Sequence, residues 1–226
     1  MLAGGFGTRL QSVVSEVPKP LAPIHGKPFL AYLLDELEKQ GIRNAILAVG
    51  YKGELVQEAL GDSHGEISLS YSFEPEPLGT GGAIALALNL HNSDQPVWII
   101  NGDTFFNCSL AAVAKTHKDN KADVTLALCH MDVADRYGLV ELDEKHFITR
   151  FREKTPGAKG LINAGVYLLD PEAIYRFDFK PRFSLEKDFF EAHLMEMRVL
   201  GSPQPGYFVD IGIPEDYDKA KEYFAA

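Results

Sequence analysis

The sequence predicts an α/β protein, with a Rossmann-like, mainly parallel sheet flanked by helices and a β-rich lobe in its second half. Three observations lead to this prediction. From residue 28 to residue 121, short apolar segments alternate with helix-like segments, a pattern typical of βαβ units. A glycine-rich segment stands near the amino terminus, where such folds place a ligand-binding turn. Beyond residue 121, strand-like segments follow one another with little helix between them.

The first half of the chain alternates predicted helices and strands. The clearest helix spans residues 28–40, where apolar residues recur at helical spacing, Pro28 suits the first turn and Gly41 can end it. The clearest strand spans residues 67–73, in which apolar residues alternate with serines, as in a half-buried strand. The other elements predicted here are strands at 45–49 and 97–100 and helices at 52–60, 80–89 and 110–118.

The second half contains mostly strands. Apolar segments at 124–128, 139–142, 147–151 and 161–169 predict strands that extend or flank the sheet, and helices follow at 185–194 and 215–224. The sequence contains no internal repeat, low-complexity tract or linker-like segment. We therefore predict a single domain over residues 1–226, with lobes at 1–121 and 122–226.

Composition excludes several classes of protein. The 226 residues are enough to bury an ordinary α/β core, and an apolar fraction of 46% is typical of a globular protein. A formal net charge of −10 argues against a general nucleic-acid binder or a binder of anionic membranes, because both attract basic surfaces. No apolar run approaches the roughly 20 residues of a membrane span, and no signal peptide can be read. We therefore expect a cytoplasmic protein without nucleic-acid or membrane partners, and a homo-oligomer remains open.

Neither the cysteines nor the histidines form a metal-binding pattern. Cys108 and Cys129 are the only cysteines, which indicates reduced thiols rather than a disulfide framework or a cysteine zinc site. The histidines show no His-Glu-x-x-His spacing, and no Gly-x-Ser-x-Gly sequence marks a nucleophilic serine. The chemistry must therefore come from other residues.

A glycine-rich segment near the amino terminus is the strongest functional signal. Residues 2–10 read LAGGFGTRL, so that Gly4, Gly5 and Gly7 let consecutive backbone N–H groups approach an anion. Arg9 on this segment, and Lys19 shortly after it, add two cations suited to phosphate oxygens. The spacing matches neither a Walker loop nor a dinucleotide-binding fingerprint. We predict a cradle for a triphosphate.

The strand that should lead into this segment is short. Only Met1 precedes Leu2, whereas a central strand of a doubly wound sheet would contribute several apolar residues. We therefore expect a few residues upstream of Met1.

Two motifs carry a family resemblance. GGFGTRL at 4–10 and PKPL at 18–21 resemble the signature of the sugar-1-phosphate nucleotidyltransferases, which join a nucleoside triphosphate to a sugar 1-phosphate and release pyrophosphate. Within that family, residues 11–29 are most similar to the D-glycero-D-manno-heptose 1-phosphate guanylyltransferases, and the resemblance covers nearly the whole chain. It implies a GT-A-like fold, GTP and D-glycero-α-D-manno-heptose 1-phosphate as substrates, Mg²⁺ as cofactor, and a nucleotide-sugar product for surface polysaccharide synthesis.

The resemblance also implies roles for particular residues. Nucleotide contacts are implied for Leu2, Ala3, Gly4, Gly5, Gly7, Thr8, Gly79, Thr80 and Gly102. The catalytic cations would be Arg9, Lys19 and Lys154. Glu74-Pro75 and residues 77–83 form a loop that, by the resemblance, would lie against the base and ribose, with Gly79 touching the base. The alternative for this loop is a helix N-terminus packed tightly on the sheet.

Two aspartates are candidate metal ligands. Asp103 follows the apolar strand predicted at 97–100, so its carboxylate stands at the carboxyl end of a strand, where open α/β folds bind ligands. Mg²⁺ commonly uses one or two carboxylates together with substrate phosphates. Asp210 also ends a short apolar strand, and it resembles the second metal ligand of the family. The alternative for Asp103 is a simple turn, and Asp216 is a weaker candidate because an acid in a first helical turn also stabilises the helix dipole.

Two further segments resemble the sugar-phosphate site of the family. Glu153 would bind the sugar and Lys154 its 1-phosphate, although a solvated surface pair is the commoner role for such neighbours. Asn163 and Gly165 lie inside an apolar segment, where a glycine often marks close approach of a ligand or of backbone. They resemble an Asn-x-Gly sugar contact, and core packing is the alternative.

These parts suggest an in-line attack by a sugar-phosphate oxygen on the α-phosphorus of the triphosphate. That oxygen is already ionised at neutral pH, so positioning and cations rather than a general base should dominate catalysis. Another base and sugar pair stays open: guanylyl transfer to mannose 1-phosphate, or thymidylyl, uridylyl or cytidylyl transfer to glucose 1-phosphate. A glycosyltransferase would instead use an Asp-x-Asp motif. A catalytically silent, regulatory homologue would be expected to lose the cations or acids that this sequence keeps.

Overall fold

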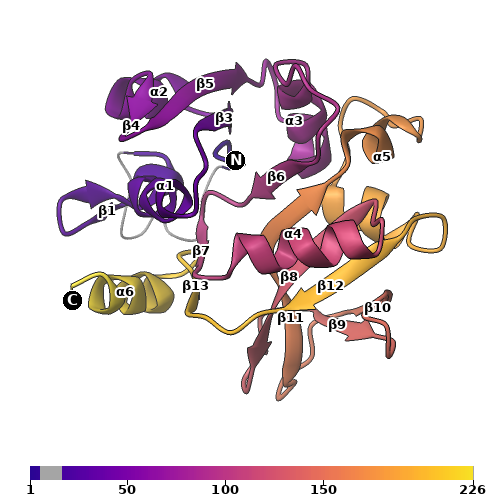
Figure 1. Ribbon diagram of the computed structural model, residues 1–226. Coiled ribbons are helices and arrows are strands. Elements are labelled where there is room, and N and C mark those ends of the chain that lie inside the picture. The colour runs from indigo at the N-terminus through magenta and orange to yellow at the C-terminus, as the bar shows by residue number, and fades with distance from the viewer. Residues whose placement is uncertain (6–16, 226) are drawn as a thin grey trace.

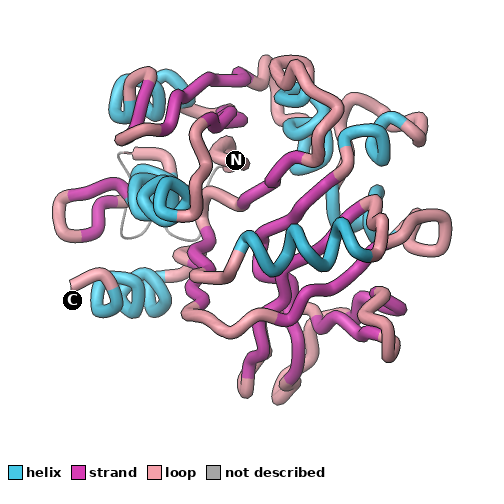
Figure 2. Tube along the Cα trace, in the orientation of Figure 1, coloured by secondary structure: helices cyan, strands magenta, loops and turns pink. Residues whose placement is uncertain are grey.

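A mixed sheet runs through the middle of the protein, whose computed structural model describes residues 1–5 and 17–225 (Figure 1). Figure 2 shows the strands crossing the molecule, with helices on its outer sides. The strands along the sheet are, in order, β4 (Ser63–His64), β5 (Ile67–Phe73), β3 (Asn44–Val49), Leu2 as an isolated bridge, β6 (Val97–Ile100), β11 (Gly160–Leu169), β8 (Val124–Met131) and β12 (Val199–Pro203).

The direction of the strands differs between the two halves of the sheet. β3 pairs in parallel with β5, and Leu2 bridges in parallel to Ala48 and Asn101, as the alternating helices and strands predict. In contrast, β11 runs antiparallel to both β6 and β8. The chain reaches β11 through β9 (Leu139–Leu142) and β10 (Ile148–Arg152) without a crossover helix, and antiparallel neighbours need none. Parallel pairing returns at the far edge of the sheet, where β12 runs parallel to β8. The Rossmann-like α/β class is confirmed, in a sheet of mixed strand directions.

The first residues of the chain lie at the centre of the sheet. The Leu2 N–H donates to Ile100 O at 2.8 Å, and the Ala3 N–H donates to Ala48 O at 2.8 Å. The Met1 amine donates to Ile46 O at 2.7 Å. Figure 1 shows this end of the chain between β3 and β6. Residues 1–3 therefore occupy the position of the strand that leads into the glycine-rich segment.

The helices agree closely with the sequence predictions. They are α1 (Phe29–Lys39), α2 (Gly53–Leu60), α3 (Gly79–Leu88), α4 (Leu110–Asp119), α5 (Pro171–Tyr175) and α6 (Pro214–Tyr223), of which α5 was not predicted. The helix predicted at 185–194 is shorter and wider than expected, because Leu185–Glu191 forms a π-helix. Its N-cap is Ser184, whose hydroxyl accepts from the Lys187 N–H, and the wide turn buries both Phe189 and Phe190.

A short antiparallel pair joins the middle of the chain to its carboxyl-terminal segment. β7 (Thr104–Phe106) directly follows the turn after β6, and β13 (Phe208–Asp210) pairs with it so that Asp210 lies opposite Thr104. The remaining short elements are β1 (Pro23–Ile24), β2 (Lys27–Pro28) and the 3-10 turn Lys19–Leu21. This pairing carries the carboxyl-terminal segment to the edge of the sheet at which Asp103 stands.

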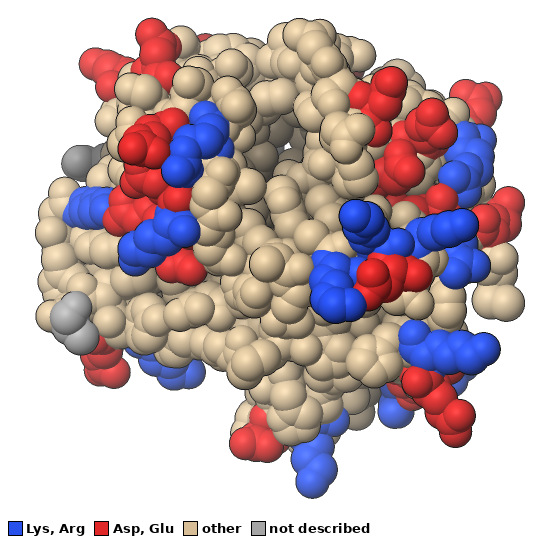
Figure 3. All heavy atoms as spheres, in the orientation of Figure 1, with Lys and Arg blue, Asp and Glu red and all other residues tan. Residues whose placement is uncertain are grey.

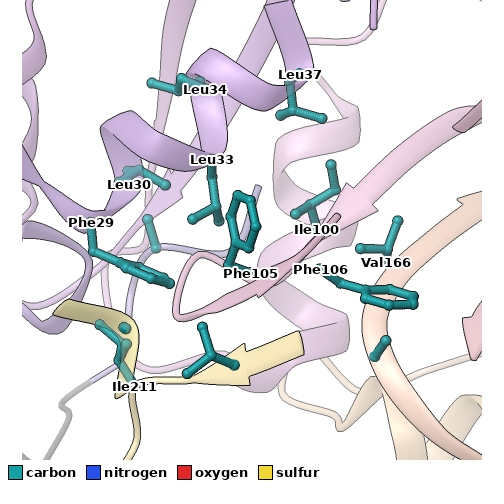
Figure 4. Packing of buried hydrophobic residues seen from close by; sticks show 14 of the residues in the cluster. Phe29, Leu30, Leu33, Leu34, Leu37, Ile100, Phe105, Phe106, Val166 and Ile211 are labelled. Carbon is teal, nitrogen blue, oxygen red and sulfur yellow. The ribbon is translucent and has the colours of Figure 1, made fainter. Parts of the chain in front are cut away.

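The apolar face of α1 explains how this edge is held in place. Phe29, Leu30, Leu33, Leu34 and Leu37 are at most 6% exposed. Figure 4 shows Leu33 and Phe29 toward Phe105 and Ile211, which belong to β7 and the turn after β13, while Leu34 lies on the other side of α1.

The surface and the remaining core agree with the composition. On the face drawn in Figure 3, basic side chains lie next to acidic ones and form no extended basic area. Cys108 and Cys129 are buried and unpaired. Across residues 1–5 and 17–225, no helix is both long and apolar enough to span a membrane.

Candidate active site

A cavity of about 560 Å³ opens at the carboxyl ends of β3, β5 and β6. This is the edge at which open α/β sheets bind their ligands, and the volume suits a nucleotide-sized molecule. Its lining includes Gly4, Gly5, Lys19, Glu74, Thr80 and Asp103. The cavity therefore joins the start of the glycine-rich segment to residues that follow three different strands.

Lys19 connects the two aspartates that the sequence singles out. Its Nζ lies 2.6 Å from Asp103 Oδ2 and 3.4 Å from Asp210 Oδ1. The Lys19 side chain is only 10% exposed, whereas the two carboxylates remain open to solvent at 40% and 27%. The β7–β13 pairing produces this arrangement, and the Ile211 N–H fixes it further by donating to Asp103 O at 3.1 Å.

The chemistry of this arrangement suits a hard divalent cation. Two carboxylates converge on one position, and the Lys19 ammonium supplies positive charge there. Mg²⁺ is typically bound by one or two carboxylates while phosphates and water complete its octahedron. Among the described residues no cluster of three or more His, Cys, Asp or Glu side chains could hold a metal, so Asp103 and Asp210 would share it with a substrate.

Three glycines in the cavity region serve different purposes. A Cβ on Gly102 would come within 2.6 Å of Leu2 O, and one on Gly4 would come within 2.5 Å of Glu74 Oε1. A Cβ on Gly5 would meet nothing within 4 Å, so this residue faces open space.

The other predicted nucleotide contacts of this segment differ in where they lie. Ala3 is 2% exposed between the central strands, and Leu2 reaches the cavity wall. The predicted contacts of Gly7, Thr8 and Arg9 lie outside the described residues and stay predictions.

The amino-terminal end of α3 forms another wall of the cavity. Gly79 has φ +72°, and a Cβ there would lie 2.6 Å from Phe183 O. The Thr80 hydroxyl donates to Glu186 Oε2 at 3.0 Å and accepts from the Leu185 N–H at 2.9 Å. The start of α3 is thus packed tightly against the chain before the π-helix, and it also lines the cavity.

Glu74 belongs to the loop expected against the base and ribose, but no role of its own was predicted for it. It follows β5 directly, and its Oε2 accepts from the Leu78 N–H at 3.0 Å. Its Oε1 lies beside Gly4 and Gly50, whose missing side chains leave room for it. Burial raises the pKa of this carboxyl above its usual value. The available signal was positional, because Glu74, like Asp103, ends a strand at the same edge of the sheet.

Asn163 and Gly165 lie on β11 beside the cavity residue Asn101. The Asn163 amide donates to the Tyr167 hydroxyl at 3.0 Å, and its Oδ1 accepts from the Gly165 N–H at 3.0 Å. Gly165 has φ +72°, and a Cβ there would lie 2.7 Å from Asn101 Nδ2. The Asn101 Oδ1 is buried and has no hydrogen-bond partner in the described part of the chain. The glycine therefore permits close packing of β11 on the turn that carries Asp103.

Glu153 and Lys154 are placed differently from the other predicted residues. Both are exposed and follow β10. Neither belongs to the described lining of the cavity around Asp103. Their predicted contacts with a sugar phosphate stay predictions.

A second cavity, of about 380 Å³, is lined in part by Asp210. Arg136 donates to the Tyr137 hydroxyl at 2.8 Å and pairs with Asp216, which also pairs with Lys219 at 2.9 Å. Burial and the nearby Asp210 raise the pKa of Tyr137 to about 12, so its hydroxyl stays protonated. Arg136 and Tyr137 were not predicted, because no local pattern in the sequence marks them. Asp216 has two cationic partners, which explains its burial without a metal.

Comparison with known proteins gives a consistent result. The nucleotidyl transferase family model matches residues 1–226. The chain is 45% identical to a D-glycero-alpha-D-manno-heptose 1-phosphate guanylyltransferase of Aneurinibacillus thermoaerophilus, over 98% of this chain and 96% of the relative. It is 42% identical to the protein of the same description from Campylobacter jejuni, over 96% and 95%. Among solved structures, HddC from Yersinia pseudotuberculosis complexed with GMP-PN superposes with a TM-score of 0.86 at 36% identity, over 99% of this chain and 97% of that one.

Proposed function

The chain belongs to the nucleotidyl transferase family, and we propose that it transfers a guanylyl group from GTP to D-glycero-α-D-manno-heptose 1-phosphate, releasing pyrophosphate. The observation that carries this proposal is the convergence of Lys19, Asp103 and Asp210 at the rim of a nucleotide-sized cavity. The relatives described as guanylyltransferases for this heptose phosphate support the choice of both substrates.

The reaction would be an in-line displacement at the α-phosphorus of GTP. The acceptor phosphate is already an anion, so the residues of the site need to position it and to offset charge, and no proton has to be removed. Asp103 and Asp210 would hold Mg²⁺, which when bound supplies positive charge to the phosphate oxygens. Lys19 would contact the phosphates, and the N–H groups of Gly4 and Gly5 would approach them. Arg9 and Lys154 are proposed as the further cations.

Glu74 supports guanine as the base. A carboxylate only accepts hydrogen bonds, and guanine presents two adjacent donors, its N1–H and its 2-amino group. The pyrimidines and adenine present an acceptor next to each donor on the equivalent edge, and a carboxylate repels it. The Glu74 carboxylate is held in the cavity by the Leu78 N–H, on the same wall as Gly79 and Thr80. We propose that it accepts from the guanine edge.

The finer properties follow as part of the same proposal. Asn163, Gly165, Glu153 and Lys154 would bind the heptose phosphate, and the product would serve surface polysaccharide synthesis. A cytoplasmic location is proposed because the buried, unpaired Cys108 and Cys129 suit a reducing compartment.

The test is a matrix of pyrophosphate release. GTP, UTP, CTP, ATP and dTTP are each combined with heptose, mannose and glucose 1-phosphates. We expect the highest kcat/KM for GTP with the heptose phosphate, whereas a preference for dTTP with glucose 1-phosphate would refute the assignment.

The site residues are tested in the same assay. We expect Asp103→Ala or Arg9→Ala to lower turnover by at least about 100-fold, the usual effect of removing one electrostatic stabiliser of a transition state. Asp119→Ala is the matched control, since Asp119 pairs with Lys115 on the exposed face of α4, outside the described lining of the cavity. Pyrophosphate release close to wild type from either site variant would contradict the assignment.

A further inference from the structure

Lys19 occupies the position between two carboxylates that a divalent cation would need. Its Nζ contacts Asp103 at 2.6 Å and Asp210 at 3.4 Å, and a Cβ on Gly212 would come within 3.3 Å of it. The Gly212 N–H in turn holds Asp210 Oδ1 at 2.7 Å. The ammonium is therefore enclosed by both carboxylates and by the loop that follows β13.

The backbone that carries Lys19 is anchored, but its side chain has room to pivot. Pro18 and Pro20 flank it, and Pro20, Leu21 and Ala22 are buried. A lysine side chain has a flexible four-carbon stem and a compact charge, so it can change partners while its backbone stays in place. Nζ also borders the 560 Å³ cavity, in which Lys19 is the sole Lys or Arg among the described lining residues.

An ammonium and a divalent cation cannot share this position. At separations near 4 Å, a single and a double positive charge repel each other strongly even where water screens them in part. Without nucleotide, a metal would have to displace Lys19 and would gain only two protein ligands, while the expelled ammonium would lose both partners. With nucleotide, the phosphates provide a new partner for Lys19 and further ligands for the metal.

We propose that Lys19 closes the metal site of the free enzyme and that nucleotide phosphates draw it away, so that the divalent cation binds with the nucleotide and not before it. This inference rests on the proposed function, because it assigns a phosphate-bearing nucleotide to the cavity. It adds an order of binding that the sequence pattern alone does not indicate.

The first experiment uses the unmodified protein. Mn²⁺ replaces Mg²⁺ as a paramagnetic probe, and water-proton relaxation distinguishes Mn²⁺ on the protein from Mn²⁺ on free nucleotide. We expect binding of Mn²⁺ to the nucleotide-free protein to be at least tenfold weaker than binding in the presence of GTP without acceptor. Equal affinities in the two conditions would overturn the proposal.

The second experiment removes the ammonium. Lys19→Met keeps the length of the side chain, and we expect it to bind Mn²⁺ at least tenfold more tightly than wild type without nucleotide. Its melting temperature should rise with added Mn²⁺, which also shows that it folds. Lys27→Met is the matched control, because Lys27 pairs with Asp35 away from the cavity, and it should bind Mn²⁺ as wild type does. No gain in affinity for Lys19→Met would contradict the closed site.

The two proposals can fail separately. The Lys19→Met measurement needs no nucleotide, so it holds whichever base the enzyme uses. Pyrophosphate release from GTP together with tight Mn²⁺ binding to the free wild-type protein would leave the function in place and remove the order of binding. If no nucleoside triphosphate releases pyrophosphate with any of the sugar 1-phosphates, the proposed function itself is refuted.

Discussion

A single substitution at Glu74 tests the proposed contact with the guanine base. Glu74→Gln keeps the shape of the residue but replaces one acceptor oxygen by a donor, which would oppose the guanine N1–H and amino groups. A hydrogen bond to a charged group contributes about 1.5–3 kcal/mol, so we expect kcat/KM for GTP relative to UTP to fall about 10- to 100-fold. Glu58→Gln, on the exposed face of α2 and outside the described lining of the cavity, is the matched control. An unchanged GTP:UTP ratio in Glu74→Gln would contradict the assignment of the base edge.

The same residue predicts a dependence on pH. Burial raises the pKa of Glu74, and only the ionised carboxylate accepts from both guanine donors. As the pH falls through this raised pKa, the protonated form accumulates, so the KM for GTP should increase at a higher pH than an ordinary glutamate would cause. In Glu74→Gln this increase should disappear, which steady-state kinetics between pH 4 and pH 8 would check. A wild-type KM that stays flat over this range would count against the role.

Individual residues differ in how far the sequence could identify them. Asp103 and Asp210 could be predicted because each ends a short apolar strand, a signal carried by neighbouring residues. Their meeting at Lys19 depends on the β7–β13 pairing of segments about a hundred residues apart, which no local pattern contains. Arg136 and Tyr137 could not be predicted for the same reason. They lie beside Asp210 and Asp216, which are more than seventy residues further along the chain.

At the scale of the element, the start of α3 has the tightest packing around the site. Gly79 and Gly157 have nearly equal φ angles, +72° and +73°, but a Cβ would meet Phe183 O at 2.6 Å at Gly79 and nothing within 4 Å at Gly157. Alanine costs about 1–2 kcal/mol at either position for the positive φ. We therefore expect Gly79→Ala to lower the melting temperature by at least about 2–4 °C more than Gly157→Ala, as measured by calorimetry. Equal losses would show that Phe183 moves away without cost.

Elements were predictable where local periodicity decides them. The apolar spacing of α1 and the alternation in β5 both gave elements within about one residue of those observed. The π-helix at Leu185–Glu191 was predicted as an ordinary helix, because local spacing does not show that Phe189 and Phe190 are both buried, in an apolar cluster that also contains Tyr167 and Leu185. The reversed direction of β11 was also not predicted, since strand direction follows from how the chain returns and not from the residues in the strand.

At the scale of the whole molecule, the two lobes are joined by the pairing of β6 with β11, here called the seam. β11 from the second lobe pairs with β6 from the first, and β6 also holds Leu2. We propose that residues 1–226 form one cooperative unit, in which neither lobe keeps its sheet without the other. Trp98 is the sole tryptophan and lies on β6, so its fluorescence reports from the seam. The fluorescence and far-UV circular dichroism transitions in urea should coincide, and two separate transitions would show independent lobes.

The buried cysteines have a practical consequence for such measurements. Burial raises the pKa of the Cys108 thiol to about 11 and raises that of Cys129 as well, so at neutral pH neither provides appreciable thiolate to an alkylating reagent. A cysteine introduced at Met195, which is 92% exposed, would then be the one fast-reacting thiol on the described surface. The protein thus offers a background-free position for a fluorescent or spin label, with both natural cysteines left in place.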